Sequence, residues 1–254
     1  MVETKKYFYE LHYFPIHALG ATTRAILCLA GADLKERVQA FEIWKVEKSL
    51  TPFGSLPILT VRDSQNKIVD GDEGSEGTVI HTIPEADVIE RYLAKQFGFF
   101  GSSVEEELRI SIFLSQTITI HNVWVFRVVP ALEPVRGSVL KTFLQVSLKN
   151  WVQNCEKYLA SNGSNGHFVG DKTSLADIKT AVLLDMFLAV DGSQECLNAT
   201  ASPELWKLKE MVDTRPEYAR YRRSEAFKKQ DELTRLKVVP GLEGFDLSRA
   251  HVFA

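Results

Sequence analysis

Tyrosine, cysteine and histidine are the residues of this 254-residue chain that could do chemistry. Tyr13 lies at the end of an aromatic-rich segment, Tyr7–Phe14, which Pro15 bounds as it would bound a buried strand. A phenolic hydroxyl at the end of a strand can face a cleft and donate a hydrogen bond to a negatively charged atom. The alternative is a core aromatic, which is how we interpret Tyr7 and Tyr9.

The cysteines and histidines form no reactive or metal-binding pattern. Cys28, Cys155 and Cys196 lie far apart, with no CxxC pair and no even number. This disfavours a disulfide scaffold, a zinc ribbon and a dithiol redox site. Cys28 falls inside an expected helix, so we do not expect a redox nucleophile there. His121 has no second ligand at i+3 or i+4, so no metal site is expected.

Composition excludes several classes of protein. The chain has 30 basic and 33 acidic side chains, 45% hydrophobic residues and 25% charged residues, as in soluble globular proteins. The near-neutral balance argues against nucleic-acid and membrane-surface binding, and acidic residues flank the basic segment 220–229. The first residues carry no apolar signal core, and no apolar run reaches about 18 residues. We therefore expect a soluble, cytoplasmic protein.

The elements that must position Tyr13 form a small α/β unit. Apolar runs predict strands over 7–14, 57–61 and 78–83. Helical composition predicts helices over 21–29, ending at Gly31, and over 84–93, opening with proline and acidic residues. The polar, glycine-bearing segment 62–77 between two strands predicts an exposed loop or hairpin. Alternation of strands and helices predicts a mixed sheet.

After Gly101 the pattern becomes helical. Apolar residues recur at three-to-four spacing over 104–129, 139–159 and 175–189, which predicts a helical bundle. Ser174 and Asp177 have the spacing of a capping box at the start of the third helix. We place the domain boundary near Gly98 and Gly101, so the domains are residues 1–98 and 103–254.

The ordered set of segments resembles the cytosolic glutathione transferases, and the N-terminal part is most similar to the sigma-like, tyrosine-using class. The resemblance rests on Tyr13-Phe14, Trp44, Lys48, Thr51–Leu59, Pro84–Ile89 and Phe168–Asp177. It covers nearly the whole chain; segment 62–77 and the tail after about residue 230 are additional. It implies a thioredoxin-like domain, an all-helical domain, a homodimer and glutathione as co-substrate, with no metal.

The resemblance also implies a role for Tyr13. A free thiol has a pKa near ~8.5 and is mostly protonated at pH 7, whereas the thiolate is the nucleophile. A tyrosine hydroxyl that donates a hydrogen bond to sulfur favours the thiolate and lowers the thiol pKa. Tyr13 matches the family's catalytic tyrosine.

Other positions match the family's glutathione-binding residues. Pro57 matches a cis-proline, and Leu56 before it would pair through its backbone with the cysteinyl part. Trp44 and Lys48 would hold the glycine end. Glu85 and Ala86, at a helix N-terminus, would hold the γ-glutamyl end.

Three positions depart from the family pattern. Ala86 stands where the family has a serine, which removes one donor and weakens binding by about 0.5–1.5 kcal/mol. Leu19 stands where an arginine often supports the tyrosine, and Thr119 where an acid of the partner subunit often lies. Either Tyr13 relies on backbone donors, or His17 substitutes, or the protein binds glutathione without much generic transferase activity.

The acceptor site is expected between the first strand–helix loop and the first long helix of the bundle. Its candidate residues are Phe14, His17, His121, Trp124 and Phe126, although aromatic residues on a helix are often core. We also hypothesise that the apolar tail after Lys237 covers this pocket.

The sequence therefore predicts a detoxification-type transferase that conjugates glutathione to a small hydrophobic electrophile. Two alternatives stay open. One is a glutathione-dependent isomerase or a dedicated biosynthetic conjugating enzyme. The other is a catalytically quiet binding or dimerisation module.

Overall fold

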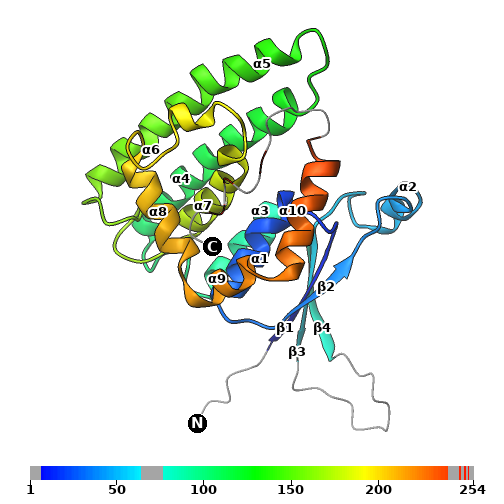
Figure 1. The fold of residues 1–254 in the computed structure, drawn as a ribbon. Helices are drawn as coiled ribbons and strands as arrows, with labels where there is room; N and C mark the ends of the chain where they lie inside the picture. The colour runs from blue at the N-terminus through cyan, green and yellow to red at the C-terminus, as the bar shows by residue number, and fades with distance from the viewer. Residues whose placement is uncertain (1–6, 64–76, 240–245, 247–248, 250, 252–254) are drawn as a thin grey trace. The chain divides into compact units, whose positions relative to one another are not determined.

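The computed structural model describes residues 7–63, 77–239, 246, 249 and 251. The chain divides into two compact units, residues 1–93 and 94–254 (Figure 1). The division between residues 93 and 94 falls inside the helix Ala86–Gln96. It lies a few residues before the boundary predicted near Gly98 and Gly101. The loop expected at 62–77 lies mostly outside the described residues.

The first unit contains a four-stranded mixed sheet, as the strand–helix alternation predicts (Figure 1). The strand order is β2-β1-β3-β4; β1 pairs in parallel with β2 and antiparallel with β3, which pairs antiparallel with β4. Its elements are β1 (Tyr7–Tyr13), η1 (Ala18–Gly20), α1 (Ala21–Leu29), β2 (Leu34–Val38), α2 (Trp44–Glu47), η2 (Lys48–Leu50), β3 (Ile58–Asp63), β4 (Thr78–Pro84) and the start of α3 (Ala86–Gln96).

The central strands β1 and β3 form the core of the sheet because their apolar side chains are covered. Tyr9, Leu11 and Tyr13 alternate along β1 and are all buried. The sequence patterns did not reveal β2, whose residues Leu34–Val38 are mostly polar and exposed. Such an edge strand lacks the apolar alternation on which strand prediction depends.

The second unit is helical, which confirms the predicted fold class (Figure 1). Its elements are α4 (Val104–Val123), η3 (Trp124–Val128), α5 (Arg136–Thr142), η4 (Phe143–Leu148), α6 (Lys149–Ser161), α7 (Leu175–Leu188), η5 (Ser193–Glu195), α8 (Pro203–Asp213), α9 (Pro216–Arg222) and α10 (Glu225–Lys237). The segments η3 and η4 are π-helical turns.

The helix α7 forms the centre of this unit. It packs against α4 and α8, and most of its residues are buried, including Leu184 and Phe187. The apolar residues of α7 are spread around the helix, so several of its faces must be covered by other helices. The apolar spacing predicted no separate segments for α8, α9 and α10, although α8 and α10 are amphipathic.

Described parts of the C-terminal tail contact the second unit's own helices. The Asp246 backbone N–H donates to the Ala189 carbonyl, and Arg249 donates to the same oxygen at 2.8 Å. His251 Nδ1 lies 2.9 Å from Arg222 Nη2, and its Nε2 lies 2.6 Å from Asp231 Oδ2. The rest of the tail, and with it the expected pocket cover, lies outside the described residues.

None of the helices in the described ranges is both long enough and apolar enough to cross a membrane.

Candidate functional site

Tyr13 ends β1, and its hydroxyl is held by the turn that follows the strand. The backbone N–H of Leu19 donates a hydrogen bond to Tyr13 Oη at 3.1 Å. The hydroxyl oxygen therefore accepts from the protein, and its own proton remains available to a ligand atom. The ring is 4% exposed, and Gly20 approaches it so closely that a Cβ there would lie 2.5 Å from Tyr13 Cδ1.

Tyr13 stays protonated at neutral pH. Burial raises the pKa of its hydroxyl to about 12, although the Leu19 hydrogen bond and the nearby Arg24 guanidinium oppose this rise. The Arg24 Cζ lies 5.8 Å from the ring centroid. The site thus presents a neutral hydroxyl donor, which is the form that can stabilise an anion without losing its proton.

Arg24 anchors the turn between β1 and α1. Its guanidinium donates to the carbonyls of Ile16 at 2.6 Å and Phe14 at 3.2 Å. It also forms a two-bond ion pair with Glu36 on β2, at 2.6 and 3.1 Å. The guanidinium is almost fully buried, so four hydrogen bonds compensate its desolvation and fix the backbone around the Tyr13 hydroxyl.

Phe14 belongs to an aromatic cluster. Its ring stacks on Phe41 at a centroid distance of 4.6 Å and meets Trp44 edge-on at 5.4 Å. These contacts attach the first turn of α2 to the end of β1. The cluster therefore places Trp44, expected to bind glutathione, next to Phe14, expected to contact the acceptor.

The Leu56–Pro57 peptide bond is cis, as expected from the sequence. Ser55, one residue earlier, donates from Oγ to Glu85 Oε1 at 3.4 Å. Glu85 has a φ of +70°, a left-handed conformation that is uncommon for a residue with a side chain, and its carbonyl accepts from Ile89 N at 3.0 Å in the first turn of α3. Strained backbone of this kind is typical of ligand sites.

The remaining candidates of the first unit lie at or near the surface. Lys48 is exposed on η2, Ala86 is half-buried at the start of α3, and His17 is half-buried just before η1. Leu19 is 42% exposed, so its side chain faces away while its N–H serves Tyr13.

The three candidates of the second unit differ in exposure. Phe126 is 71% exposed, whereas Trp124 is fully buried and packs on Phe143 and Phe187 with centroids 5.3 and 6.2 Å apart. Trp124 is therefore part of the core of its unit. His121 is mostly buried, and burial, together with the Lys179 charge, lowers its pKa to about 4, so it is neutral at pH 7.

Sequence reasoning missed Arg24, Glu36, Gln39 and Phe41. A signal existed for Arg24, because it is the only charged residue in the otherwise uncharged helix segment 21–29. Gln39 is buried, and its N–H donates to the Tyr13 carbonyl at 2.9 Å. Its partners Glu47 and His12 come from other elements, so only the folded chain reveals the contact.

Across the described ranges, no three His, Cys, Asp or Glu side chains gather in a way that could hold a metal ion.

A family model described as "Glutathione S-transferase, C-terminal domain" matches residues 133–225. A curated relative from Caenorhabditis elegans, "Probable glutathione S-transferase 6", is 30% identical over 220 residues. This match covers 83% of the present chain and 98% of the relative.

Solved structures share the fold. A sigma-class glutathione S-transferase from Fasciola hepatica superposes with a TM-score of 0.69 at 22% identity, covering 87% of this chain and all of the other. A protein described as monomeric Na-GST-3, a glutathione S-transferase of Necator americanus, superposes with a TM-score of 0.68 at 23% identity, covering 86% and 98%. At these identities the similarity establishes the fold alone.

Proposed function

The chain belongs to the glutathione S-transferase family, and we propose that it conjugates the thiolate of glutathione to a small hydrophobic electrophile, with Tyr13 stabilising the thiolate. The Leu19 N–H bond to Tyr13 Oη is the observation that carries this proposal. Because the Tyr13 hydroxyl oxygen accepts this hydrogen bond, the phenolic O–H can donate its own hydrogen bond to the glutathione sulfur. A backbone donor thereby takes the place of the arginine that Leu19 replaces.

Other residues of the first unit support the proposed placement of glutathione. The resemblance assigns the backbone of Leu56, which precedes the cis peptide bond to Pro57, to the cysteinyl part of glutathione. The Glu85 carboxylate, held by Ser55, suits the positively charged amine of the γ-glutamyl end. Lys48 is exposed and offers a positive charge for the glycine carboxylate, and Trp44 offers an indole N–H. The expected acceptor residues remain predictions.

The mechanism needs little beyond positioning and charge stabilisation. The thiol loses its proton to solvent, and the Tyr13 hydroxyl donates a hydrogen bond to the resulting thiolate. The sulfur then forms a bond to an electrophilic carbon, and the leaving group departs or the added electron pair takes up a proton.

The test is a titration of bound glutathione by the ultraviolet absorbance of its thiolate across pH. The wild type is expected to lower the thiol pKa, and Tyr13→Phe to return it toward ~8.5. A hydrogen bond to a charged group contributes about 1.5–3 kcal/mol, so the difference should be about 1 to 2 pH units. Conjugation rates should fall in parallel.

Tyr9→Phe is the matched control. Tyr9 lies on the same face of β1 and is 3% exposed, so its variant also removes one buried hydroxyl. It should leave the thiol pKa unchanged. A wild type that binds glutathione without a shifted pKa would contradict the transferase mechanism, and absence of binding would favour the non-enzymatic module.

A further inference from the structure

The short helix α2 carries two of the residues assigned to glutathione, but little in the helix itself holds it in place. Trp44 and Lys48 lie four residues apart, and the Lys48 N–H donates to the Trp44 carbonyl, so both side chains lie on one face of the turn. No residue of Trp44–Glu47 is buried, and Ile43, at the N-cap, has no polar side chain to cap the helix. A single helical turn is not stable by itself, so contacts with other elements must fix its position.

Gln39 joins this helix to the end of β1. It is 2% exposed, and its backbone N–H donates to the Tyr13 carbonyl at 2.9 Å. Its side-chain Nε2 donates to Glu47 Oε2 at 2.8 Å and to the Ala40 carbonyl at 3.1 Å. One buried residue therefore contacts both the strand end that carries Tyr13 and the helix that carries Trp44.

The neighbours of the Gln39 amide determine its orientation. Two acceptors, the Glu47 carboxylate and the Ala40 carbonyl, lie on one side of it, so the NH₂ group must be on that side. Gln39 Oε1, on the opposite side, lies 2.9 Å from His12 Nε2, which therefore donates. Burial lowers the pKa of the His12 imidazole below its ordinary value of 6.5, so the ring is neutral at pH 7 and donates one N–H. The three side chains form a chain of hydrogen bonds in which each donor has an acceptor.

The bond between Gln39 and Glu47 fixes the rotation of α2. The edge-on contact of Phe14 with Trp44, at a centroid distance of 5.4 Å, attaches the helix at one point. A single point of attachment leaves the helix free to rotate about it, and a second point at another residue removes that freedom. A hydrogen bond to a carboxylate is short and directional, which suits it to this purpose. Because Glu47 precedes Lys48 in the same turn, fixing Glu47 also fixes the direction in which Lys48 extends.

We propose that Gln39 is a positioning residue for the glycine end of glutathione. It holds Glu47 and thereby orients α2, so that Trp44 and Lys48 face the glycine carboxylate. This inference rests on the proposed function, because it concerns the same glutathione site. Since the bond to Tyr13 comes from the Gln39 backbone, changes of the Gln39 side chain act on the glycine end alone.

The test compares glutathione with γ-glutamylcysteine, which lacks the glycine residue. Calorimetry measures the binding of both ligands to the full chain, as wild type and as Gln39→Met, which keeps the size of the side chain and removes its hydrogen bonds. Wild type is expected to prefer glutathione. Gln39→Met should lower this preference by about 10-fold, because Lys48 is no longer held for its charged hydrogen bond to the glycine carboxylate. γ-Glutamylcysteine should bind both proteins equally.

Kinetics distinguish positioning from a general loss of structure. With 1-chloro-2,4-dinitrobenzene as the electrophile, Gln39→Met should raise KM for glutathione and leave kcat unchanged, because the lost binding is equal in the ground state and the transition state. The pKa of the bound thiol should keep its wild-type value, in contrast to Tyr13→Phe. Equal losses of affinity for glutathione and γ-glutamylcysteine, or a fall in kcat with an unchanged KM, would overturn the proposal.

An exchange of side chains tests the pairing itself. Gln39→Glu places a second carboxylate against Glu47 and should weaken glutathione binding at least as much as Gln39→Met. Adding Glu47→Gln restores a donor that faces an acceptor and should recover most of the loss. Glu42→Gln, at an exposed glutamate before α2, restores the same net charge outside the pair, so it should not rescue Gln39→Glu. Equal rescue by the two changes would contradict the pairing.

Glu47→Ala provides the same test at a half-buried position if Gln39→Met lowers the melting temperature. It should also lower the preference for glutathione over γ-glutamylcysteine. Glu42→Ala is the matched control, because it removes an exposed glutamate of the same segment, and it should leave the preference unchanged.

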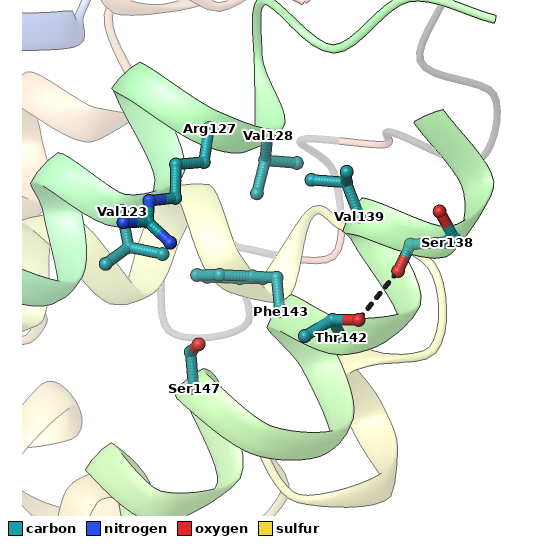
Figure 2. Close-up of a pocket in the computed structure, with 8 residues that line it drawn as sticks. All are labelled: Val123, Arg127, Val128, Ser138, Val139, Thr142, Phe143 and Ser147. Atoms are coloured by element: carbon teal, nitrogen blue, oxygen red, sulfur yellow. Dashed lines mark hydrogen bonds between the residues drawn. The ribbon is translucent and has the colours of Figure 1, made fainter. Parts of the chain in front are cut away.

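One further control excludes binding elsewhere. A cavity of about 400 Å³ lies in the second unit, between the end of α4 with η3 and α5 with η4, and Arg127 is the charged residue among those that line it (Figure 2). An anionic peptide that entered this cavity would contribute to the heat of binding. Arg127→Gln should leave the preference for glutathione unchanged, and loss of the preference in this variant instead of Gln39→Met would overturn the proposal.

The outcomes separate this inference from the proposed function. A wild type that does not bind glutathione would overturn the proposed function, and the role of Gln39 with it. A wild type that binds and prefers glutathione, together with an undiminished preference in Gln39→Met and Glu47→Ala, would overturn only the role of Gln39.

Discussion

The chemistry of the first unit depends on how one hydroxyl is held. Tyr13 Oη accepts from a backbone N–H, and its ring lies against Gly20 and near Arg24. A backbone donor costs no side-chain entropy to position, so it can replace a flexible arginine at this point. The departure at Leu19 is thus compatible with thiolate stabilisation.

Gly20→Ala should disturb this arrangement directly. The new Cβ would lie 2.5 Å from Tyr13 Cδ1 and 2.9 Å from Arg24 Nη1, while the φ of −83° is acceptable for alanine. The ring must therefore move. We expect the conjugation rate to fall by about 10- to 100-fold and the free energy of unfolding by about 1–3 kcal/mol.

Gly137→Ala provides the comparison, because a Cβ there meets nothing within 4 Å. It should keep full activity and raise stability by up to about 1 kcal/mol. Full activity in Gly20→Ala would show that the position of the ring does not limit the reaction.

His121 should make stability depend on pH. Burial and the Lys179 charge lower its pKa to about 4 in the folded chain, against 6.5 as the ordinary value. Between these values the unfolded chain binds the proton and the folded chain does not, so the free energy of unfolding falls as the pH falls from 6.5 to 4. Above pH 6.5 this contribution is fully present.

Denaturant titrations at pH 7 and pH 4.5 test this effect. His121→Gln should lose about 1–3 kcal/mol less stability than wild type over that interval. Parallel losses in the two proteins would mean that His121 is protonated in the folded state.

At the scale of elements, side-chain hydrogen bonds determine where segments begin. Asp177 is fully buried in the first turn of α7 and accepts from Ser174 N at 2.8 Å, Ser174 Oγ at 2.9 Å and Phe168 N at 2.9 Å. The first bond is one half of the predicted capping box, which is present at this helix start. The third joins the preceding loop to the helix, which the spacing alone did not indicate.

Asp177→Ala should therefore be strongly destabilising. It leaves three donors in a buried place without an acceptor, which should lower the free energy of unfolding by about 3–4 kcal/mol. Urea unfolding measures this change.

Ser103→Ala is the control, because it removes an exposed cap at the start of α4. The Ser103 Oγ accepts from Glu106 N at 3.2 Å, and its loss should lower the free energy of unfolding by about 1 kcal/mol. Equal effects would contradict the importance of burial.

At the scale of the whole molecule, each unit has its own core. In the helical unit a buried ionic cluster connects three helices: Lys209 on α8 pairs with Asp185 on α7 at 2.5 Å and with Asp213 at 2.6 Å, and Arg222 on α9 pairs with Asp185 at 2.6 Å. These cations hold the pKa of the Asp185 carboxyl below its usual range despite burial. The cluster therefore connects α7, α8 and α9 through buried ion pairs, while burial raises the pKa of the Asp213 carboxyl.

The described surface of α4 bears an apolar stripe that suits a second copy of this chain. Val104, Leu108 and Ile112 recur every four residues and are 79%, 61% and 52% exposed. Homodimers are what the resemblance implies, although one structural neighbour is described as monomeric. We expect light scattering to give twice 28.6 kDa for the wild type and 28.6 kDa for Leu108→Glu.

Arg109→Glu is the control for the dimer prediction. It introduces the same residue at the next exposed position, off the stripe, and should leave the mass unchanged. A wild-type mass of 28.6 kDa would overturn the prediction.

The sequence by itself determined the fold class, the strands predicted at 7–14, 57–61 and 78–83, the main helical segments and the capping box at Ser174. These features depend on local periodicity and on contacts between residues a few positions apart, so the spacing of residue types in the sequence predicts them directly. It also indicated Tyr13 and the cis bond before Pro57, through the ordered motifs of a family.

The tertiary structure alone decided which groups surround those residues. The donor to Tyr13 is the backbone of Leu19, Arg24 joins two carbonyls of the β1–α1 turn to Glu36, and Trp124 is buried in a core. The π-helical turns Trp124–Val128 and Phe143–Leu148 are not visible as a pattern in the sequence. Such features depend on side chains and backbone groups brought together by packing, and residue types at fixed spacing carry no information about that geometry.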